Sequence, residues 1–228
     1  GDVNGDGWPD IAMANSGLNA VTIFKNTTSS GGAITFTTQA VSVTVGSAPL
    51  AISMCDLDGD GRPDLVTTNS SGNNVSLLRN QSVSGTISYA AALSLTAGTT
   101  PRSVAIGDFD GDGRVDLAVA NQGSNTVQVF RNASVLGSIT FALSASLTGG
   151  ITGPYYVSAG DFNGDSFLDL EVANYSANTV RIFQNNALSG SISFSAGLTV
   201  TSGTGPSNMA LGDTDGDGRA DFEIELAG

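Results

Sequence analysis

The chain is 228 residues long and carries 21 acidic against 8 basic residues, for a formal net charge of −13. This acidic balance argues against nucleic acid as a partner, because nucleic-acid binding requires clustered Lys and Arg. The chain contains no His and one Cys, so it has no internal disulfide, and Cys55 has no imidazole base to activate it. No apolar run approaches the length that spans a membrane.

The elements predicted along the chain are short strands in a repeating order. A nine-residue acidic loop at 2–10 is followed by segments rich in Val, Ile, Thr and Phe that alternate in polarity, with Gly, Asn and Ser between them. Such alternation predicts strands. In the later repeats a further strand is predicted before the loop, and a Pro precedes the loop by seven residues at Pro49, Pro101, Pro154 and Pro206. No segment shows a helical period with caps.

Successive acidic loops begin 54, 52, 53 and 52 residues apart, which indicates a repeat architecture. Each repeat contains four predicted strands: one before the loop, one after it, a third that ends at an Asn, and a fourth after a Gly/Ser turn. Four antiparallel strands in about 50 residues are typical of a β-propeller blade. We therefore predict an all-β propeller segment as a single domain over 1–228. Its parts are a partial blade 1–46, blades 47–98, 99–150 and 151–203, and a partial blade 204–228.

The five loops share the pattern Asp-x-Asp/Asn-Gly-Asp-Gly/Ser-x-x-Asp and contain 18 of the 21 acidic residues. Carboxylates gathered in a small volume repel one another unless a cation neutralises them. Oxygen ligands at positions 1, 3, 5 and 9, with the backbone carbonyl of position 7, suit Ca²⁺ better than Mg²⁺ or softer metals. The alternative interpretation is five acidic surface turns. The predicted ligands of up to five Ca²⁺ ions are Asp2, Asn4, Asp6, Trp8, Asp10, Asp56, Asp58, Asp60, Arg62, Asp64, Asp108, Asp110, Asp112, Arg114, Asp116, Asp161, Asn163, Asp165, Phe167, Asp169, Asp213, Asp215, Asp217, Arg219 and Asp221.

The string that begins at Pro101 and ends with Gly-Asp-Phe-Asp-Gly-Asp-Gly-Arg-Val-Asp-Leu-Ala-Val-Ala-Asn at 121 resembles the FG-GAP/VCBS repeat family over a whole blade. Blades of this family, with their calcium loops, also build the head of integrin α-subunits. The resemblance covers essentially the whole chain and implies a calcium-binding propeller that is secreted or at the cell surface. It also implies a fragment of a larger secreted bacterial protein, with further blades outside this chain.

Two functions are compatible with this resemblance. The first is a binding or adhesion scaffold, integrin-like or lectin-like, that recognises a glycan or an extracellular protein. The second is a non-catalytic accessory propeller of a larger secreted hydrolase, lyase or protease. Trp8, Tyr155 and Tyr156 are candidates for stacking on a sugar.

Catalytic residues are few, because the aspartates are assigned to metal and His is absent. The only other acidic residues are Glu171, Glu223 and Glu225. For Glu171 and Glu223 the interpretations are a solvated flank, a contact to a loop cation, or a polar contact for a ligand. We therefore predict that the chain is not an enzyme.

Overall fold

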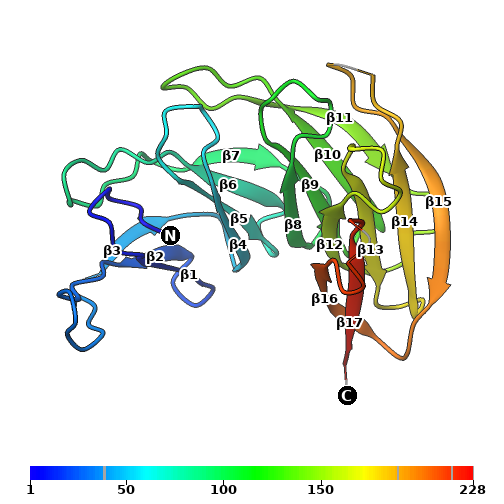
Figure 1. Ribbon diagram of the computed structural model, residues 1–228, viewed down its shortest axis with the longest axis horizontal. Helices are drawn as coiled ribbons and strands as arrows, with labels where there is room; N and C mark the ends of the chain where they lie inside the picture. Colours follow the sequence, from blue (N-terminus) through cyan, green and yellow to red (C-terminus); the bar gives the residue numbers. More distant parts are fainter. Residues whose placement is uncertain (38–39, 189, 217, 228) are drawn as a thin grey trace. The chain divides into compact units, whose positions relative to one another are not determined.

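The computed structural model describes residues 1–37, 40–188, 190–216 and 218–227. These residues form seventeen β-strands in five antiparallel sheets, and each sheet takes its strands in chain order (Figure 1). No described residue lies in a helix. The predicted all-β repeat fold is confirmed, since three of the sheets contain four consecutive antiparallel strands.

The strands are assigned to the sheets as follows. The first sheet contains β1 (Ile11–Asn15), β2 (Ala20–Phe24) and β3 (Val41–Thr44). The second contains β4 (Pro49–Cys55), β5 (Asp64–Asn69), β6 (Asn74–Leu78) and β7 (Leu93–Thr96). The third contains β8 (Pro101–Gly107), β9 (Asp116–Asn121), β10 (Thr126–Asn132) and β11 (Phe141–Leu147). The fourth contains β12 (Pro154–Gly160), β13 (Asp169–Asn174), β14 (Thr179–Asn185) and β15 (Phe194–Thr201), and the fifth contains β16 (Pro206–Gly212) and β17 (Asp221–Leu226).

The first strand of each later sheet begins at the proline noted in the sequence. Proline has no N–H to donate, so it is tolerated at the first residue of a strand and disrupts pairing further in. In the third sheet Pro101 pairs with Asn121, and the register then shifts before Ser103 pairs with Ala120. Pro154 and Pro206 show the same shift. The prolines therefore mark the point where each new sheet begins.

Contacts divide the described chain into two compact units. The first contains residues 1–96 with the hairpin 134–140, and the second contains 97–133 with 141–228. In the first unit the core includes Val21, Ile23 and Leu65. In the second it is built around Phe109, whose ring lies edge-on to that of Phe194 with centroids 5.8 Å apart.

The second strands of the third and fourth sheets contain small residues at buried positions. Ala118 and Ala120 on β9 are fully buried and pack in one cluster with Val157 on β12 and Leu170 on β13. Because these residues come from the third and fourth sheets, the alanines lie where two successive sheets of the second unit meet. Small side chains allow the two backbones to approach closely there.

Glu171 corrects one interpretation of the sequence. It lies on β13 at the position that Ala118 takes on β9, and its side chain is 0% exposed, so it is not part of a solvated flank. Its Oε2 accepts a hydrogen bond from the Ser158 hydroxyl at 3.0 Å. Glu223, at the same position on β17, is exposed. The two glutamates therefore have different environments although their sequence positions correspond.

Candidate metal centres

The acidic loops at 56–64, 108–116, 161–169 and 213–221 connect the first strand of a sheet to the second, whereas loop 2–10 directly precedes β1. Position 9 of the loop is the first residue of the second strand, as for Asp64 on β5 and Asp116 on β9. In loops 2–10, 56–64 and 108–116 position 2 reaches into the core, where Val3, Leu57 and Phe109 are buried. The loop is therefore held at one end by the sheet and near the other end by a buried apolar side chain.

Glycines give the loops their curl. In loop 56–64 both Gly59 and Gly61 have positive φ, at 76° and 81°. Glycine adopts this region without the steric cost that a Cβ brings. Loop 161–169 differs, because Ser166 replaces the second glycine and still has a φ of 71°. Ser166 therefore adopts a left-handed conformation that carries a steric cost for a residue with a Cβ.

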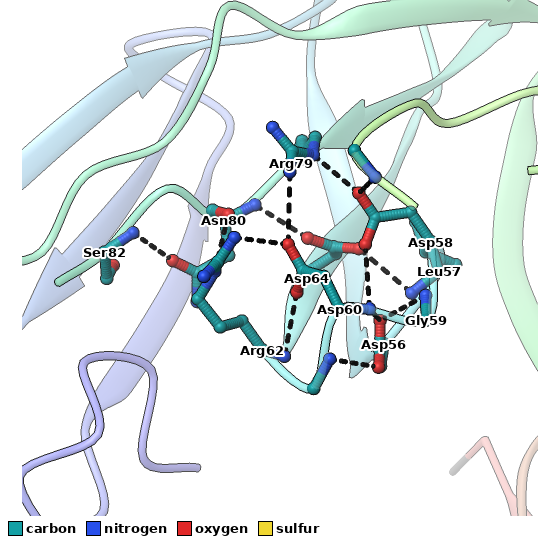
Figure 2. Close-up of polar contacts among 12 residues, drawn as sticks. Asp56, Leu57, Asp58, Gly59, Asp60, Arg62, Asp64, Arg79, Asn80 and Ser82 are labelled. Carbon is teal, nitrogen blue, oxygen red and sulfur yellow. Dashed lines mark hydrogen bonds and ion pairs between the residues drawn. The ribbon is translucent and has the colours of Figure 1, made fainter. Parts of the chain in front are cut away.

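Backbone N–H groups organise the first carboxylate of each loop. In loop 56–64, shown in Figure 2, Asp56 Oδ1 accepts from the N–H groups of Gly59 and Asp60, and Asp56 Oδ2 accepts from Gly61 at 2.8 Å. Loops 2–10, 108–116 and 161–169 repeat this pattern at the same positions. The local sequence alone thus orients the first carboxylate toward the inside of the loop.

The last carboxylate is held from two sides. Asp64 Oδ2 accepts from the N–H of Leu57 at 2.9 Å, and Asp64 Oδ1 accepts from the N–H of Asn80 at 2.7 Å. Burial raises the pKa of Asp64 to about 6, against the opposing effect of these two donors. Asp116 has the same two kinds of donor and a pKa raised to about 6 for the same reason. Each of these buried carboxylates would be stabilised by a nearby cation.

Three loops bring carboxylate oxygens close enough to share one ion. In loop 56–64 the oxygens of positions 1, 3 and 9 lie within 4.8 Å of one another, and the same holds for loops 108–116 and 213–221. Ca²⁺ takes oxygen ligands at about 2.3–2.6 Å, so two ligands of one ion lie no more than about 5 Å apart. The acidic clusters could therefore hold a metal ion. Their members are Asp56, Asp58, Asp64, Asp108, Asp110, Asp116, Asp213, Asp215 and Asp221.

The remaining predicted ligands lie in the same loops. Position 5 is not part of these groups, and in loops 56–64 and 108–116 its carboxylate pairs with arginines. Asn4 and Asn163 occupy position 3 in the other two loops, and their Oδ1 atoms accept from the N–H of Asp6 and Asp165. Asp217, predicted as a ligand in the last loop, lies outside the described residues.

Basic side chains balance part of the charge in the first three loops. Arg79 pairs with Asp58 and Asp60, and Arg62 also pairs with Asp60. Four carboxylates and two guanidinium groups give loop 56–64 a formal charge of −4 + 2 = −2. Loop 108–116, with Arg114 and Arg131, has the same sum of −4 + 2 = −2. Loop 2–10 has three aspartates and Lys25, 3.1 Å from Asp6, for −3 + 1 = −2.

The sequence does not reveal that a basic residue and an Asn, at the end of the third strand of a repeat or directly after it, contact the loop. They are Lys25 with Asn26, Arg79 with Asn80, and Arg131 with Asn132, and Gln184 with Asn185 takes their place in the fourth sheet. Their signal is a constant position, sixteen residues after the last aspartate of the loop for Asn80. They were treated as part of a strand because nothing local shows that they contact a loop.

The fold and the loops define a propeller-type repeat protein whose acidic loops connect the strands of each blade. The model of the FG-GAP-like repeat matches four times, over residues 2–67, 56–119, 108–172 and 161–222. Together these matches span nearly the whole chain, and the chain belongs to the FG-GAP-like repeat family. No curated protein matches it in sequence.

Solved structures with a similar fold include enzymes. The periplasmic gluconolactonase of Pseudomonas aeruginosa is 17% identical with a TM-score of 0.63, over 98% of this chain and 56% of that one. A Bacteroides fragilis protein assigned as a 6-phosphogluconolactonase is 18% identical with a TM-score of 0.60, over 88% and 53%. The virginiamycin B lyase of Staphylococcus aureus is 15% identical with a TM-score of 0.50, over 91% and 57%. The chain thus spans little more than half the length of these proteins.

These structures overturn two predictions. The chain was predicted to be a non-catalytic binding, adhesion or accessory module, and not an enzyme. Both predictions are wrong as stated, because the neighbours of this fold include lactonases and a lyase. The small number of acid–base residues outside the loops is therefore no argument against catalysis in such a fold. At 15–18% identity the likeness shows the fold alone, so no activity is transferred to this chain.

The remaining predictions are neither confirmed nor contradicted. Among the described residues no helix is long and apolar enough to cross a membrane. The blade boundaries, the complete ligand list, the origin in a larger secreted protein and the glycan or extracellular-protein partner stay predictions.

Proposed function

We propose that this chain is a calcium-binding propeller repeat module, in which each acidic loop holds one Ca²⁺ and the bound ions stabilise the blades. The carboxylates or amides of positions 1, 3, 5 and 9 and the backbone carbonyl of position 7 would hold the ion. The ion would neutralise the carboxylates that the loop brings together.

The observation that carries this proposal is the charge of the first three loops. Each has a formal charge of −2 once its paired basic side chains are counted. One divalent cation would bring each loop to neutrality. The loops differ in their number of aspartates, yet loop 2–10, with one fewer, also has one basic partner fewer. This compensation favours a divalent ion over a monovalent one.

The donor set favours calcium among divalent ions. Every side chain that the loop offers at positions 1, 3, 5 and 9 ends in a carboxylate or amide oxygen. Mg²⁺ requires a stricter octahedron and retains several waters, whereas Ca²⁺ accepts six to eight oxygens in flexible geometry. Because free calcium is abundant outside cells and scarce in the cytosol, we also propose that the chain works in a secreted or cell-surface protein.

Isothermal titration calorimetry on chelator-treated protein tests the proposal. We expect Ca²⁺ to bind at several sites and Mg²⁺ to bind more weakly. Asp112→Asn should weaken binding at one site, whereas Glu223→Gln removes an exposed carboxylate outside the loops and should leave every site unchanged. Absence of calcium binding to the folded chain, or equal losses in the two variants, would overturn the assignment.

A further inference from the structure

One asparagine connects two successive loops in the first unit. Asn80 is fully buried, and its Nδ2 donates to the carbonyl of Val3 in loop 2–10 at 2.8 Å. The same Nδ2 donates to the carbonyl of Pro63 in loop 56–64 at 2.9 Å. The backbone N–H of Asn80 donates to Asp64, the last carboxylate of that loop, as Figure 2 shows. A single residue therefore contacts the loops of two repeats.

The second unit repeats this arrangement with other residues. Asn185 is buried, and its Nδ2 donates to the carbonyls of Phe109 and Leu168, at 3.0 Å each. These carbonyls belong to loops 108–116 and 161–169, at the positions that Val3 and Pro63 take in the first unit. The N–H of Asn185 donates to Asp169 at 2.8 Å. Two separate parts of the chain thus use the same contacts, which argues against a chance hydrogen bond.

The asparagine side chain cannot turn away easily. Its Oδ1 accepts from the N–H of Ser82 in the first unit and of Ala187 in the second, both at 2.8 Å. The amide is therefore satisfied on both ends, with its Nδ2 shared between the two loops. In a buried site each of these hydrogen bonds is costly to break without a replacement.

A nearby hairpin adds a second contact between the same pairs of loops. The N–H of Gly85, five residues after Asn80, donates to the carbonyl of Asn4 at 3.1 Å, and the N–H of Gly190 donates to that of Asp110 at 2.8 Å. Asn4 and Asp110 occupy position 3, a predicted ligand position. The carbonyls of positions 2 and 3 in one loop thus both accept hydrogen bonds from the following repeat.

We propose that Asn80 and Asn185 are positioning residues that couple the metal loops of successive repeats, so that loading of one loop raises the affinity of its neighbour. This inference rests on the proposed calcium function. The physical reason is that one buried asparagine contacts both loops. Its side-chain Nδ2 holds the position-2 carbonyl of one loop and the position-8 carbonyl of the next, and its backbone N–H holds the position-9 carboxylate of that next loop. An ion that orders either loop also restricts the conformation of the shared asparagine. The second loop then loses less conformational entropy when it binds its own ion, so its affinity is higher.

The sole tryptophan of the chain makes the test site-specific. Trp8 occupies position 7 of loop 2–10, and terbium is a luminescent surrogate for calcium that a nearby indole sensitises. Titration of the chelator-treated chain with Tb³⁺ under tryptophan excitation reports on loop 2–10. The combined substitution Asp2→Asn with Asp6→Asn must remove this signal, which assigns it to that loop.

The coupling is measured by disabling loop 56–64 with Asp58→Asn and Asp60→Asn. We expect the affinity of loop 2–10 for Tb³⁺ to fall about fivefold or more, the usual lower range for allosteric coupling. In an Asn80→Ser background the same loop substitutions should change the affinity less than twofold. Unchanged affinity after loss of loop 56–64, with normal terbium binding, would overturn the coupling and leave the calcium function standing.

The first repeat offers a matched control. Asn26 is buried, and it donates its N–H to Asp10 and its Nδ2 to the carbonyl of Pro9. Both acceptors belong to loop 2–10, and among the described residues Asn26 has no hydrogen bond with a second loop. Asn26→Ser should therefore leave the full effect of disabling loop 56–64. Equal loss of coupling in the Asn26 and Asn80 variants would assign the effect to general destabilisation and refute the proposal.

A second reporter keeps the proposal testable if Asn80→Ser does not fold. Phe167 takes the position of Trp8 in loop 161–169 and is partly exposed. Phe167→Trp with Trp8→Phe moves the tryptophan to that loop, and Asp110→Asn with Asp112→Asn then disables loop 108–116. We expect the affinity of loop 161–169 for Tb³⁺ to fall when loop 108–116 is disabled, and Asn185→Ser to abolish this fall. An affinity that does not change when loop 108–116 is disabled would refute the coupling in this unit. If no variant shows a terbium signal that calcium can displace, the calcium function itself is refuted.

Discussion

Replacing Glu171 by glutamine should make the stability of the chain less dependent on pH. The Glu171 side chain is 0% exposed on β13, and among the described atoms Oε1 has no hydrogen-bond partner. Burial raises its pKa from 4.5 to about 7, and the hydrogen bond from Ser158 opposes this shift only in part. Glutamine has nearly the same shape and no charge, so Glu171→Gln removes the cost of burying the ion.

The size of the effect follows from the two pKa values. A difference of about 2.5 units corresponds to roughly 3 kcal/mol between the protonation states. Below pH 4.5 both the folded and the unfolded states hold the proton, and Glu171 contributes no electrostatic penalty. As the pH rises from 4.5 through about 7, the unfolded state loses its proton first and the folded state is destabilised. The wild type should therefore lose up to about 3 kcal/mol relative to the variant over this range.

Urea denaturation of both proteins at pH 4.5 and pH 8 measures this difference. The two free energies of unfolding should be nearly equal at the lower pH, and the variant should be more stable by about 2–3 kcal/mol at the higher pH. Titration of the loop aspartates cancels because it is common to both proteins. Glu223→Gln, an exposed glutamate at the corresponding position, serves as the control and should show no such gap. A wild type that is equally or more stable than Glu171→Gln at pH 8 would show that Glu171 is charged and partnered there, contrary to this reasoning.

Four further predictions concern the loops and the core. Removal of calcium with EDTA should lower the melting temperature, since calcium at a hundredfold excess over Kd adds about 2.7 kcal/mol per site to the free energy of unfolding. A melting temperature that EDTA does not change would contradict the calcium assignment. Ser166→Gly should relieve about 1 kcal/mol of strain at φ 71° and tighten loop 161–169 in a terbium titration, and a weaker loop would argue against strain there. Cys55 should alkylate far more slowly at pH 8 than a thiol peptide, because burial raises its pKa to about 12; equal rates would show that the thiol is open to solvent. Phe109→Ala should destabilise the second unit by about 3–5 kcal/mol in urea, and a loss below about 1 kcal/mol would mean that its ring is not central to the core.

The pattern of the loop determines its local geometry. Gly59 and Gly61 supply the left-handed residues of loop 56–64, and the hydrogen bonds of Asp56 span only three to five residues. Bonds over such short separations depend on local sequence, so five copies of one pattern give loops of one kind. The strand order follows for a similar reason, since consecutive strands pair across short connections.

Contacts between repeats were decided by the tertiary structure. Asn80 and Val3 are 77 residues apart, and nothing near either residue indicates that a side-chain amide of one bonds a carbonyl of the other. Arg79 and Asp58, 21 residues apart, meet only because the third strand of the sheet ends beside the loop. Glu171 could be read as solvated from its sequence, yet its side chain is 0% exposed in the folded chain. The repeat, the loops and the blade-forming strands are thus set by local hydrogen bonding and periodicity. The charge balance of the loops, their connection to one another and the burial of Glu171 depend on which surfaces the packed sheets bring together.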